Sequence, residues 1–376
     1  MKQWVTNQDG LENLKLVQDA PMPEGLKEGE VLVKINRVSL NYRDTEGKDR
    51  EDVADGSSVA VAMGLYKHHK GVPADQNGLV PCSDICGTIT KISGSSDKVE
   101  GFQEGDRVMA TFNQTHVRGQ IVAADMASGL GLPLTGCLTE YRIFPATGLV
   151  KVPDYLSDEE AACLPIATVT AWMSINSFQP LGEPMRGRDK VVLLQGTGGV
   201  AVSGLQIAKA LGLTTIITSS SDAKLERARK MGADHTINYK TTPDWHEEVL
   251  SLTNGKGADV VFETGGAHIL AKSFECVAFG GLISCIGYLS GKEDAPGNRM
   301  NTNVLALKRN VTLKGILNGS RERFEEMLRC VYTGDAQSGK QIHPVVDKVF
   351  QFEETKEAFQ YLFRGGHFGK VVIQVS

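Results

Sequence analysis

The chain has 376 residues, more than one domain usually contains, so we expect two domains with a cleft between them. Hydrophobic residues make up 41%, charged residues 23%, and the formal net charge is −5, which is ordinary for a globular protein and shows no basic excess of the kind that nucleic-acid binding requires. The N-terminus lacks a basic segment followed by an apolar one, and no window is apolar enough to span a membrane, so we expect a cytoplasmic protein without nucleic-acid or membrane partners.

The first 150 residues are typical of a small β-rich domain. Residues 30–38 alternate apolar and polar side chains, and residues 87–92 and 107–111 show the same pattern in short segments separated by glycines. Residues 46–79, rich in Gly, Asp, Lys and His, indicate a long loop or insertion. The seven cysteines are odd in number and scattered, which favours reduced thiols over disulfides.

From Ser157 onward the pattern changes to helices that alternate with apolar strands. Ser157 begins a helix as an N-cap, with Glu160 three residues later. The expected strands are residues 191–194, 215–218, 260–263 and 282–286, and the expected helices include 200–211 and 222–231. This alternation predicts a doubly wound parallel sheet covered on both faces. Residues 369–375 form a last strand with no helix after it, which we expect to return to the first domain.

A glycine loop joins the first apolar strand to the helix that follows it. The loop contains Gly196, Thr197, Gly198, Gly199 and Val200, followed by Ala201. Gly196 permits a tight turn, Gly198 or Gly199 lets the backbone approach a pyrophosphate, and the small Ala201 allows close contact between helix and sheet. A plain turn is the alternative, but a strand, loop, helix and second strand in this order favour dinucleotide binding on a Rossmann domain.

The end of the second strand bears on which dinucleotide binds. NAD-preferring sites place an acidic residue there, whereas this strand ends in Ser219, Ser220 and Ser221, with Lys224 soon after. Hydroxyl groups and an ammonium can donate hydrogen bonds to a 2′-phosphate, which favours NADP(H) over NAD(H). Asp222 leaves the question open, and Ser221 with Asp222 is also an ordinary helix cap.

Several further segments, in this order, carry a resemblance that covers nearly the whole chain. They are residues 39–44 (SLNYRD), 80–87 (VPCSDICG), 105–108 (GDRV), 157–164 (SDEEAACL), 170–172 (TAW), the glycine loop and 369–373 (GKVVI). With them the chain resembles the medium-chain dehydrogenases/reductases, in the zinc-independent branch similar to alcohol dehydrogenases and quinone oxidoreductases. The resemblance implies a chaperonin-10-like (GroES-like) partial β-barrel domain from residues 1–152 and 306–376, with the Rossmann domain, residues 153–305, inserted between them. We also expect a homodimer.

The resemblance also bears on a catalytic metal. Zinc-dependent relatives carry ligands where this chain has Asn41, Ser83 and Ile166, none of which offers a thiolate or imidazole. The four closely spaced cysteines of a structural zinc lobe are missing as well. Cys82 and Cys86 with a distant His68, His69 or His116 are the alternative ligand set, but we predict no bound zinc.

Without a metal, hydrogen-bond donors must stabilise the charge that develops on the reacting oxygen. Asn41 lies where the resemblance places residues near the nicotinamide, and Tyr66 matches approximately a tyrosine that related enoyl reductases use as an acid. Tyr66 is equally consistent with a loop aromatic that faces solvent, and Tyr42 is expected to pack on the cofactor.

The resemblance implies further cofactor contacts, most of them after successive strands of the sheet. They are Thr170, Tyr239, Gly265, Gly266, Ile286, Gly287, Tyr288, Phe368, Gly369 and Lys370. Some of these positions also have a purely structural interpretation, since Gly265 and Gly266 can form a simple turn and Lys370 can be a surface cation. Their place at the carboxyl edge of the sheet favours the functional interpretation.

The sequence therefore predicts an NADP(H)-dependent, zinc-independent oxidoreductase that transfers hydride to a small enone, quinone or carbonyl substrate. A zinc-free alcohol dehydrogenase or carbonyl reductase is the first alternative, because both reactions use the same site. A cofactor-binding protein with little turnover is the second.

Overall fold

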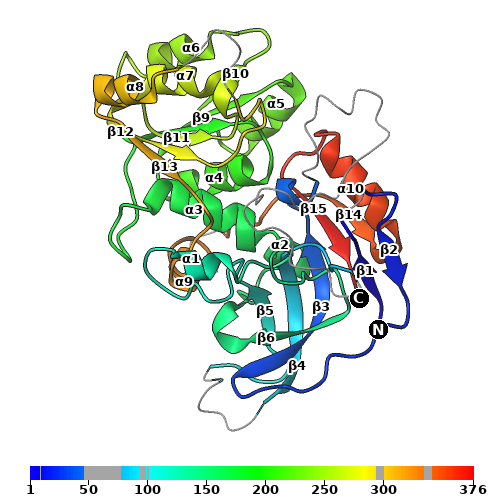
Figure 1. Ribbon diagram of the computed structural model, residues 1–376. Coiled ribbons are helices and arrows are strands. Elements are labelled where there is room, and N and C mark those ends of the chain that lie inside the picture. The colour runs from blue at the N-terminus through cyan, green and yellow to red at the C-terminus, as the bar shows by residue number, and fades with distance from the viewer. Residues whose placement is uncertain (9, 46–77, 94–98, 100, 294–299, 334–340) are drawn as a thin grey trace.

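The computed structural model describes residues 1–8, 10–45, 78–93, 99, 101–293, 300–333 and 341–376. Two sheets organise this part of the chain, a parallel one in the upper half of Figure 1 and a largely antiparallel one in the lower half. Both termini lie beside the antiparallel sheet. The antiparallel sheet is built from the two ends of the chain and the parallel sheet from its middle, which confirms the expected GroES-like and Rossmann parts.

The antiparallel sheet is built around one long central strand. Its strands are β3 (Glu30–Ser39), β4 (Asp84–Ile92), β5 (Arg107–Ala110), β6 (Tyr141–Pro145), β7 (Leu149–Lys151), β14 (Val346–Gln351) and β15 (Lys370–Gln374). They follow the order β14-β15-β3-β4-β5-β7, with β6 also paired to β3, and only β14 and β15 run parallel to each other. A separate hairpin pairs β1 (Gln3–Val5) with β2 (Lys15–Val17). The apolar alternation in β3 places Val31, Val33 and Ile35 in the core, as the sequence predicts.

The parallel sheet has the strand order of a doubly wound dinucleotide-binding fold. Its strands are β8 (Val191–Gln195), β9 (Thr214–Ser219), β10 (His235–Asn238), β11 (Ala258–Glu263), β12 (Val277–Cys285) and β13 (Thr312–Gly315). The order β10-β9-β8-β11-β12-β13 places β8 at the centre, where the order reverses. The outer strand β13 begins after residue 305, the expected end of the Rossmann part, and still pairs within the parallel sheet. The next strand, β14, belongs to the antiparallel sheet, so the chain passes from one sheet to the other between Gly315 and Val346. The domain boundaries and the homodimer stay predictions.

Helices cover both sheets. They are α1 (Ala123–Met126), α2 (Asp158–Ala162), α3 (Val169–Asn176), α4 (Gly199–Ala210), α5 (Asp222–Lys230), α6 (Trp245–Leu252), α7 (Ala267–Cys276), α8 (Thr302–Arg309), α9 (Arg321–Val331) and α10 (Thr355–Phe363). Single turns η1 (Tyr42–Thr45), η4 (Ala146–Gly148), η5 (Leu164–Thr168) and η7 (Phe352–Glu354) connect them. Among the described helices, α2, α5, α8 and α9 begin at a capping side chain. The predicted cap of α2 is present, because the Ser157 hydroxyl accepts from the Glu160 amide at 3.2 Å.

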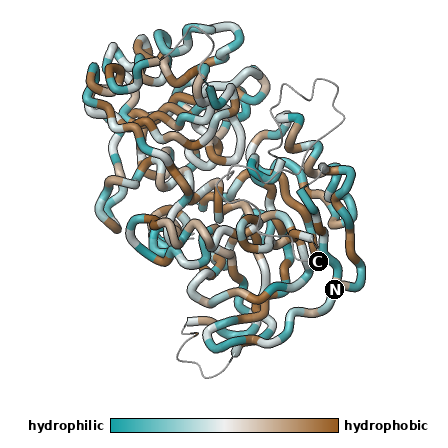
Figure 2. Tube along the Cα trace, in the orientation of Figure 1, coloured by the Kyte–Doolittle hydropathy of each residue, from teal (hydrophilic) through white to brown (hydrophobic). Residues whose placement is uncertain are grey.

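Apolar strands form the centre of each half, as the brown segments of Figure 2 show. In the parallel sheet, β8 is buried along its whole length because helices cover both of its faces. One cluster of buried side chains spans both halves, since it contains Cys86 and Met109 of the antiparallel sheet together with Val192 and Leu194 of β8. The two halves therefore share part of one core.

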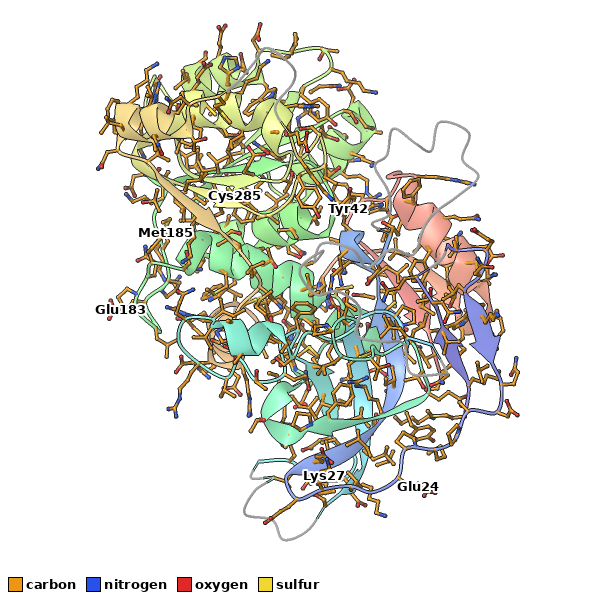
Figure 3. All side chains as sticks on the ribbon, in the orientation of Figure 1. Glu24, Lys27, Tyr42, Glu183, Met185 and Cys285 are labelled. Carbon is orange, nitrogen blue, oxygen red and sulfur yellow. The ribbon has the colours of Figure 1, made fainter. Side chains whose placement is uncertain are left out.

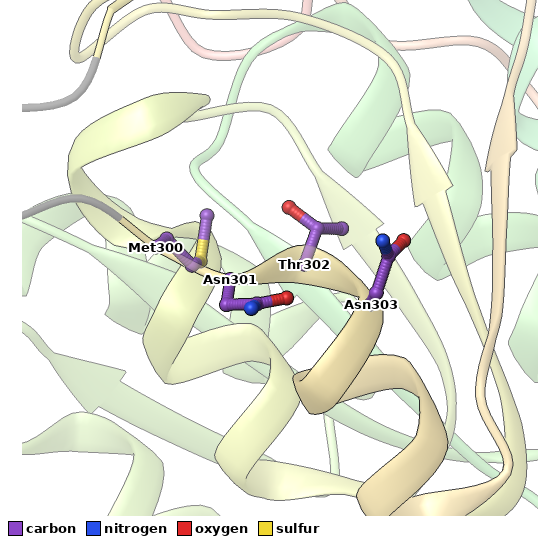
Figure 4. Close-up of a pocket in the computed structure, with 4 residues that line it drawn as sticks. All are labelled: Met300, Asn301, Thr302 and Asn303. Atoms are coloured by element: carbon purple, nitrogen blue, oxygen red, sulfur yellow. The ribbon is translucent and has the colours of Figure 1, made fainter.

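No helix among the described residues is long and apolar enough to cross a membrane. A hollow at the start of α8 is lined by Met300, Asn301, Thr302 and Asn303 (Figure 4). The Asn301 side chain there accepts from the Val304 amide at 3.1 Å as a helix cap. The described residues that line this hollow carry no carboxylate, imidazole or thiol.

Candidate functional site

The glycine loop lies at the carboxyl edge of the parallel sheet, between β8 and α4. Gly196 has a φ of +83°, a backbone conformation that L side chains rarely adopt, and Gly198 is the N-cap of α4. The Gly196 amide donates to the Thr218 hydroxyl at 3.3 Å, which ties the loop to the end of β9. The first amide groups of α4 therefore lie at the strand-order reversal, where such sheets bind pyrophosphates.

The start of the C-terminal strand crosses this loop. Gly369 forms a parallel bridge with Gly198, and its amide donates to the Thr197 carbonyl at 3.2 Å. A Cβ on Gly199 would lie 2.7 Å from Cδ of Lys370, so only glycine allows this approach. Residues that lie about 170 positions apart in the sequence thus form one surface.

The serine and lysine side chains named for the cofactor lie at the end of β9 and the start of α5. Ser219 is buried with its hydroxyl 3.5 Å from that of Thr197, and Ser221 caps α5 by accepting from the Lys224 amide at 3.4 Å. The Lys224 ammonium donates to the Gly365 carbonyl at 2.9 Å. Asp222 accepts from the Asn238 amide at 2.8 Å, so its carboxylate is turned toward the end of β10.

A buried carboxylate organises the turn after β11, which the sequence analysis did not identify. Glu263 accepts from the amides of Gly265 and Gly266 at 2.8 and 2.9 Å, and from Ser273 and the Gln195 side chain. Burial raises the pKa of Glu263. The two glycines therefore form a turn held by Glu263. Polar residues that end otherwise apolar strands, as Gln195 and Glu263 do, were the available signal.

The remaining predicted cofactor contacts divide into exposed and buried positions. Tyr42 is 37% exposed on η1, between the two sheets (Figure 3), and Tyr239 is 42% exposed after β10. Val200, Ser220, Ile286 and Tyr288 are half-buried, whereas Thr170 is buried on α3. The Phe368 ring is buried beneath the Arg227 guanidinium, 4.2 Å from the ring centroid, so it packs between the halves. Gly287 lies against the carbonyl of Thr264.

Asn41 lies in a buried polar cluster next to this loop. The Lys370 ammonium donates to the Asn41 side-chain oxygen at 2.6 Å and to the Leu40 carbonyl at 2.7 Å, and lies 3.7 Å from the Asp84 carboxylate. Asn41, Asp84 and Lys370 are at most 8% exposed. The Asn41 Nδ2 atom has no hydrogen-bond partner among the described residues. Tyr66, the other predicted catalytic residue, lies outside the described residues.

Asp44 completes the cluster from the other side of Asn41. Its carboxylate accepts from the Asn41 backbone amide at 2.7 Å. Burial raises the pKa of Asp44 to about 6, although the Arg43 guanidinium opposes this change. Asn41 is thus held at its backbone amide and at its side-chain oxygen.

The three positions that correspond to zinc ligands converge on the same cluster. The Ser83 hydroxyl and the Ile166 amide both donate to the Asp84 carboxylate, at 2.8 and 3.1 Å. A hydroxyl, an amide and an aliphatic side chain are not the nitrogen and sulfur donors that a catalytic zinc site uses. Among the described residues no group of three or more His, Cys, Asp or Glu side chains is placed to hold a metal. Burial raises the pKa values of Cys82 and Cys86, and His68 and His69 lie outside the described residues.

Comparison with known proteins accounts for both halves of the chain. The family model described as "Alcohol dehydrogenase GroES-like domain" matches residues 27–154, and the one described as "Zinc-binding dehydrogenase" matches residues 199–333. A zinc-type alcohol dehydrogenase-like protein of Schizosaccharomyces pombe is 39% identical over 367 residues, covering 98% of this chain and 96% of that protein.

Two further matches carry more specific names. A 2-haloacrylate reductase of a Burkholderia species is 30% identical over 254 residues, covering 64% of this chain and 72% of that protein. A solved structure titled as an NAD-dependent alcohol dehydrogenase superposes with a TM-score of 0.79 at 30% identity, covering all of both chains. Of these two similar proteins, one is thus named as a reductase and the other as a nicotinamide-dependent dehydrogenase.

His367 gives the site a testable dependence on pH. Its Nε2 lies 3.9 Å from where a Gly198 Cβ would be, and burial, with the ammonium groups of Lys224 and Lys370, lowers its pKa to about 4 despite Asp347. An ordinary histidine in the unfolded chain is protonated below about pH 6.5. Between these values the unfolded chain binds more protons, so the free energy of unfolding falls as the pH falls, by up to about 3 kcal/mol.

Urea denaturation without added nucleotide, at pH 7 and at pH 4.5, measures this effect. His367→Gln should lose less stability over this interval than the wild-type chain, because it removes the group that titrates only in the unfolded state. His268→Gln, which removes an imidazole outside this cluster, is the control and should keep the wild-type loss. An equal loss in His367→Gln and wild type would contradict the assignment.

Proposed function

Because this chain belongs to the medium-chain dehydrogenase/reductase family of oxidoreductases, we propose that it uses NADP(H), without zinc, to transfer hydride to or from a small enone, quinone or carbonyl substrate. The observation that carries the proposal is the meeting of the glycine loop with the Asn41 cluster through Gly369 and Lys370. Such a junction brings a dinucleotide-binding loop next to a hydrogen-bond donor.

The residues of the loop fit the dinucleotide. The amide groups at the start of α4 would hold the pyrophosphate, and Ser219, Ser220, Ser221 and Lys224 would hold a 2′-phosphate. When bound, the cofactor supplies or accepts the hydride. The task left to the chain is to place the substrate oxygen and to stabilise its developing charge. The Asn41 Nδ2 group is a buried donor suited to that task.

A carbonyl or alcohol substrate is the second candidate. The solved structure titled as an alcohol dehydrogenase favours it, whereas the relative named 2-haloacrylate reductase favours reduction of an activated C=C bond. Both reactions need the same donor near an oxygen atom, so the Asn41 cluster supports either.

A substrate panel tests the proposal as a whole. The purified chain, kept in a chelator, should oxidise NADPH with at least one enone, quinone or aldehyde, and elemental analysis should find less than stoichiometric zinc. Both outcomes follow from a site whose ligand positions hold Asn41, Ser83 and Ile166. NADPH binding without oxidation across the panel would favour a binding protein instead, and one zinc per chain whose removal abolishes turnover would refute the metal-free site.

The cofactor preference depends on Lys224. NADPH should bind tighter than NADH, and Lys224→Ala should weaken NADPH binding by about 1.5–3 kcal/mol, the usual contribution of one hydrogen bond to a charged group. NADH, which has no 2′-phosphate, should lose much less. Fluorescence titration of both cofactors measures the difference, with Lys230→Ala on the same helix as control. Equal affinities of the wild-type chain for both cofactors would contradict the preference.

The catalytic role depends on Asn41. Asn41→Ala should lower turnover about 10²- to 10³-fold at saturating cofactor, as removal of one donor to a developing oxyanion does. Asn36 on β3, the strand that ends two residues before Asn41, is the control, since its side-chain amide donates to Asp158 and Thr88. Asn36→Ala should keep the turnover of its folded fraction. A normal rate in Asn41→Ala, with a deuterated cofactor showing that hydride transfer limits the rate, would rule out this donor.

A further inference from the structure

We propose that Lys370 is the positioning residue for Asn41: its buried ammonium holds the Asn41 side-chain oxygen and thereby leaves Nδ2 as the donor that faces the reaction. This inference rests on the function proposed for Asn41 above. It assigns Lys370 a role in orienting another side chain in place of the direct cofactor contact that the sequence predicts.

The first step of the argument is the orientation of the Asn41 amide. A lysine ammonium can only donate hydrogen bonds, so the atom at 2.6 Å from Nζ must be the amide oxygen and not the nitrogen. The backbone amide of Asn41 is fixed at the same time by Asp44. With one end of the side-chain amide held, the position of the other end follows.

The second step concerns the other end of that amide. Nδ2 is buried and has no partner in the described part of the chain, a state that is unfavourable for a polar group removed from water. Buried polar groups in folded proteins are mostly hydrogen-bonded, to protein or to ordered water. Because Lys370 occupies the oxygen of this amide, its nitrogen is the end that remains available to an acceptor other than the described residues.

The third step is the position of Lys370. Its side chain passes within contact distance of Gly199, in the first turn of α4, before its ammonium reaches Leu40 and Asn41. The hydrogen bonds of the ammonium go to two carbonyl-type oxygens, and the Asp84 carboxylate lies 3.7 Å away. All of its described partners belong to the antiparallel half of the chain, which is what a positioning role requires.

A double-mutant cycle tests the inference. Lys370→Met should lower turnover about 10- to 100-fold, because a donor that is free to rotate is misplaced for part of the time. In the Asn41→Ala background the same substitution should lower turnover by no more than about threefold further, since the donor is already gone. NADPH affinity, measured by fluorescence, should change by less than about threefold in Lys370→Met.

Two further variants separate the positioning role of Lys370 from a general loss of stability. Lys370→Met leaves Asp84 unpaired in the core, so the pair Lys370→Met with Asp84→Asn is the version that avoids a lone buried charge, and thermal melting checks that each variant is folded. Lys256→Met, at a half-exposed lysine that pairs with Asp259, is the control and should keep wild-type turnover and cofactor affinity.

Each contrary outcome overturns a distinct statement. Unchanged turnover in the folded Lys370 variants would overturn the positioning role. So would a double variant whose loss of turnover equals the product of the losses in Lys370→Met and Asn41→Ala. Weaker NADPH binding with normal turnover at saturation would make Lys370 a cofactor contact and would also overturn it. Unchanged turnover in Asn41→Ala alone would instead remove the donor on which the proposed function depends.

Discussion

The ammonium of Lys370 is a charge taken out of water, and the arrangement of the site follows from how that charge is satisfied. Moving a lysine into a protein interior costs several kcal/mol unless opposite charge and hydrogen-bond acceptors meet it there. Here the Leu40 and Asn41 oxygens lie within 2.7 Å, and the Asp84 carboxylate lies 3.7 Å away. Asp84 in turn accepts from Ile166, so the cluster joins β15, the end of β3, β4 and the turn before α3.

The same cluster fixes the distance between two parts of the site that lie on different sheets. Lys370 follows Gly369, and Gly369 is bridged to Gly198 in the glycine loop. The loop and the Asn41 amide are therefore separated by Gly369 and the side chain of Lys370, not by a flexible linker. Pre-organisation of this kind matters for hydride transfer, because reacting groups misplaced by about 1 Å can cost roughly 10² in rate.

The fold could be predicted to the extent that local patterns determine it. The apolar runs and caps of β8, α4, β9 and α5 depend on neighbouring residues, and their observed bounds lie close to the predicted ones. Short strands of mixed polarity, such as β6, β10 and β13, give no periodic signal and were not anticipated. Leu164–Thr168 form a π-helical turn that begins just before Pro165, a departure from α-helical geometry that the local sequence pattern does not predict.

The site was predictable where it depends on a motif and not where it depends on contacts distant in sequence. The glycine loop and the serines after β9 could be located from their order alone. The contact between Lys370 and Asn41 joins residues 329 positions apart, and no spacing in the sequence records which atom of the lysine faces which residue. The hydrogen bond between Gln195 and Glu263 could not be predicted for the same reason, since in the sequence each is a single polar residue at the end of its own strand.

The buried ammonium also bears on the question of a metal. A divalent ion at the Asn41 oxygen would compete with Lys370 for the same lone pairs and would place two positive charges beside each other in a medium of low polarity. One carboxylate, Asp84, already balances the lysine, so a further cation would need new negative charge in the cluster. Burial raises the pKa of Asp44 to about 6, which makes that second carboxylate a poor source of it in mildly acidic solution. In the proposed metal-free site the lysine supplies the positive charge, and the Asn41 amide transmits its polarising effect as a hydrogen-bond donor.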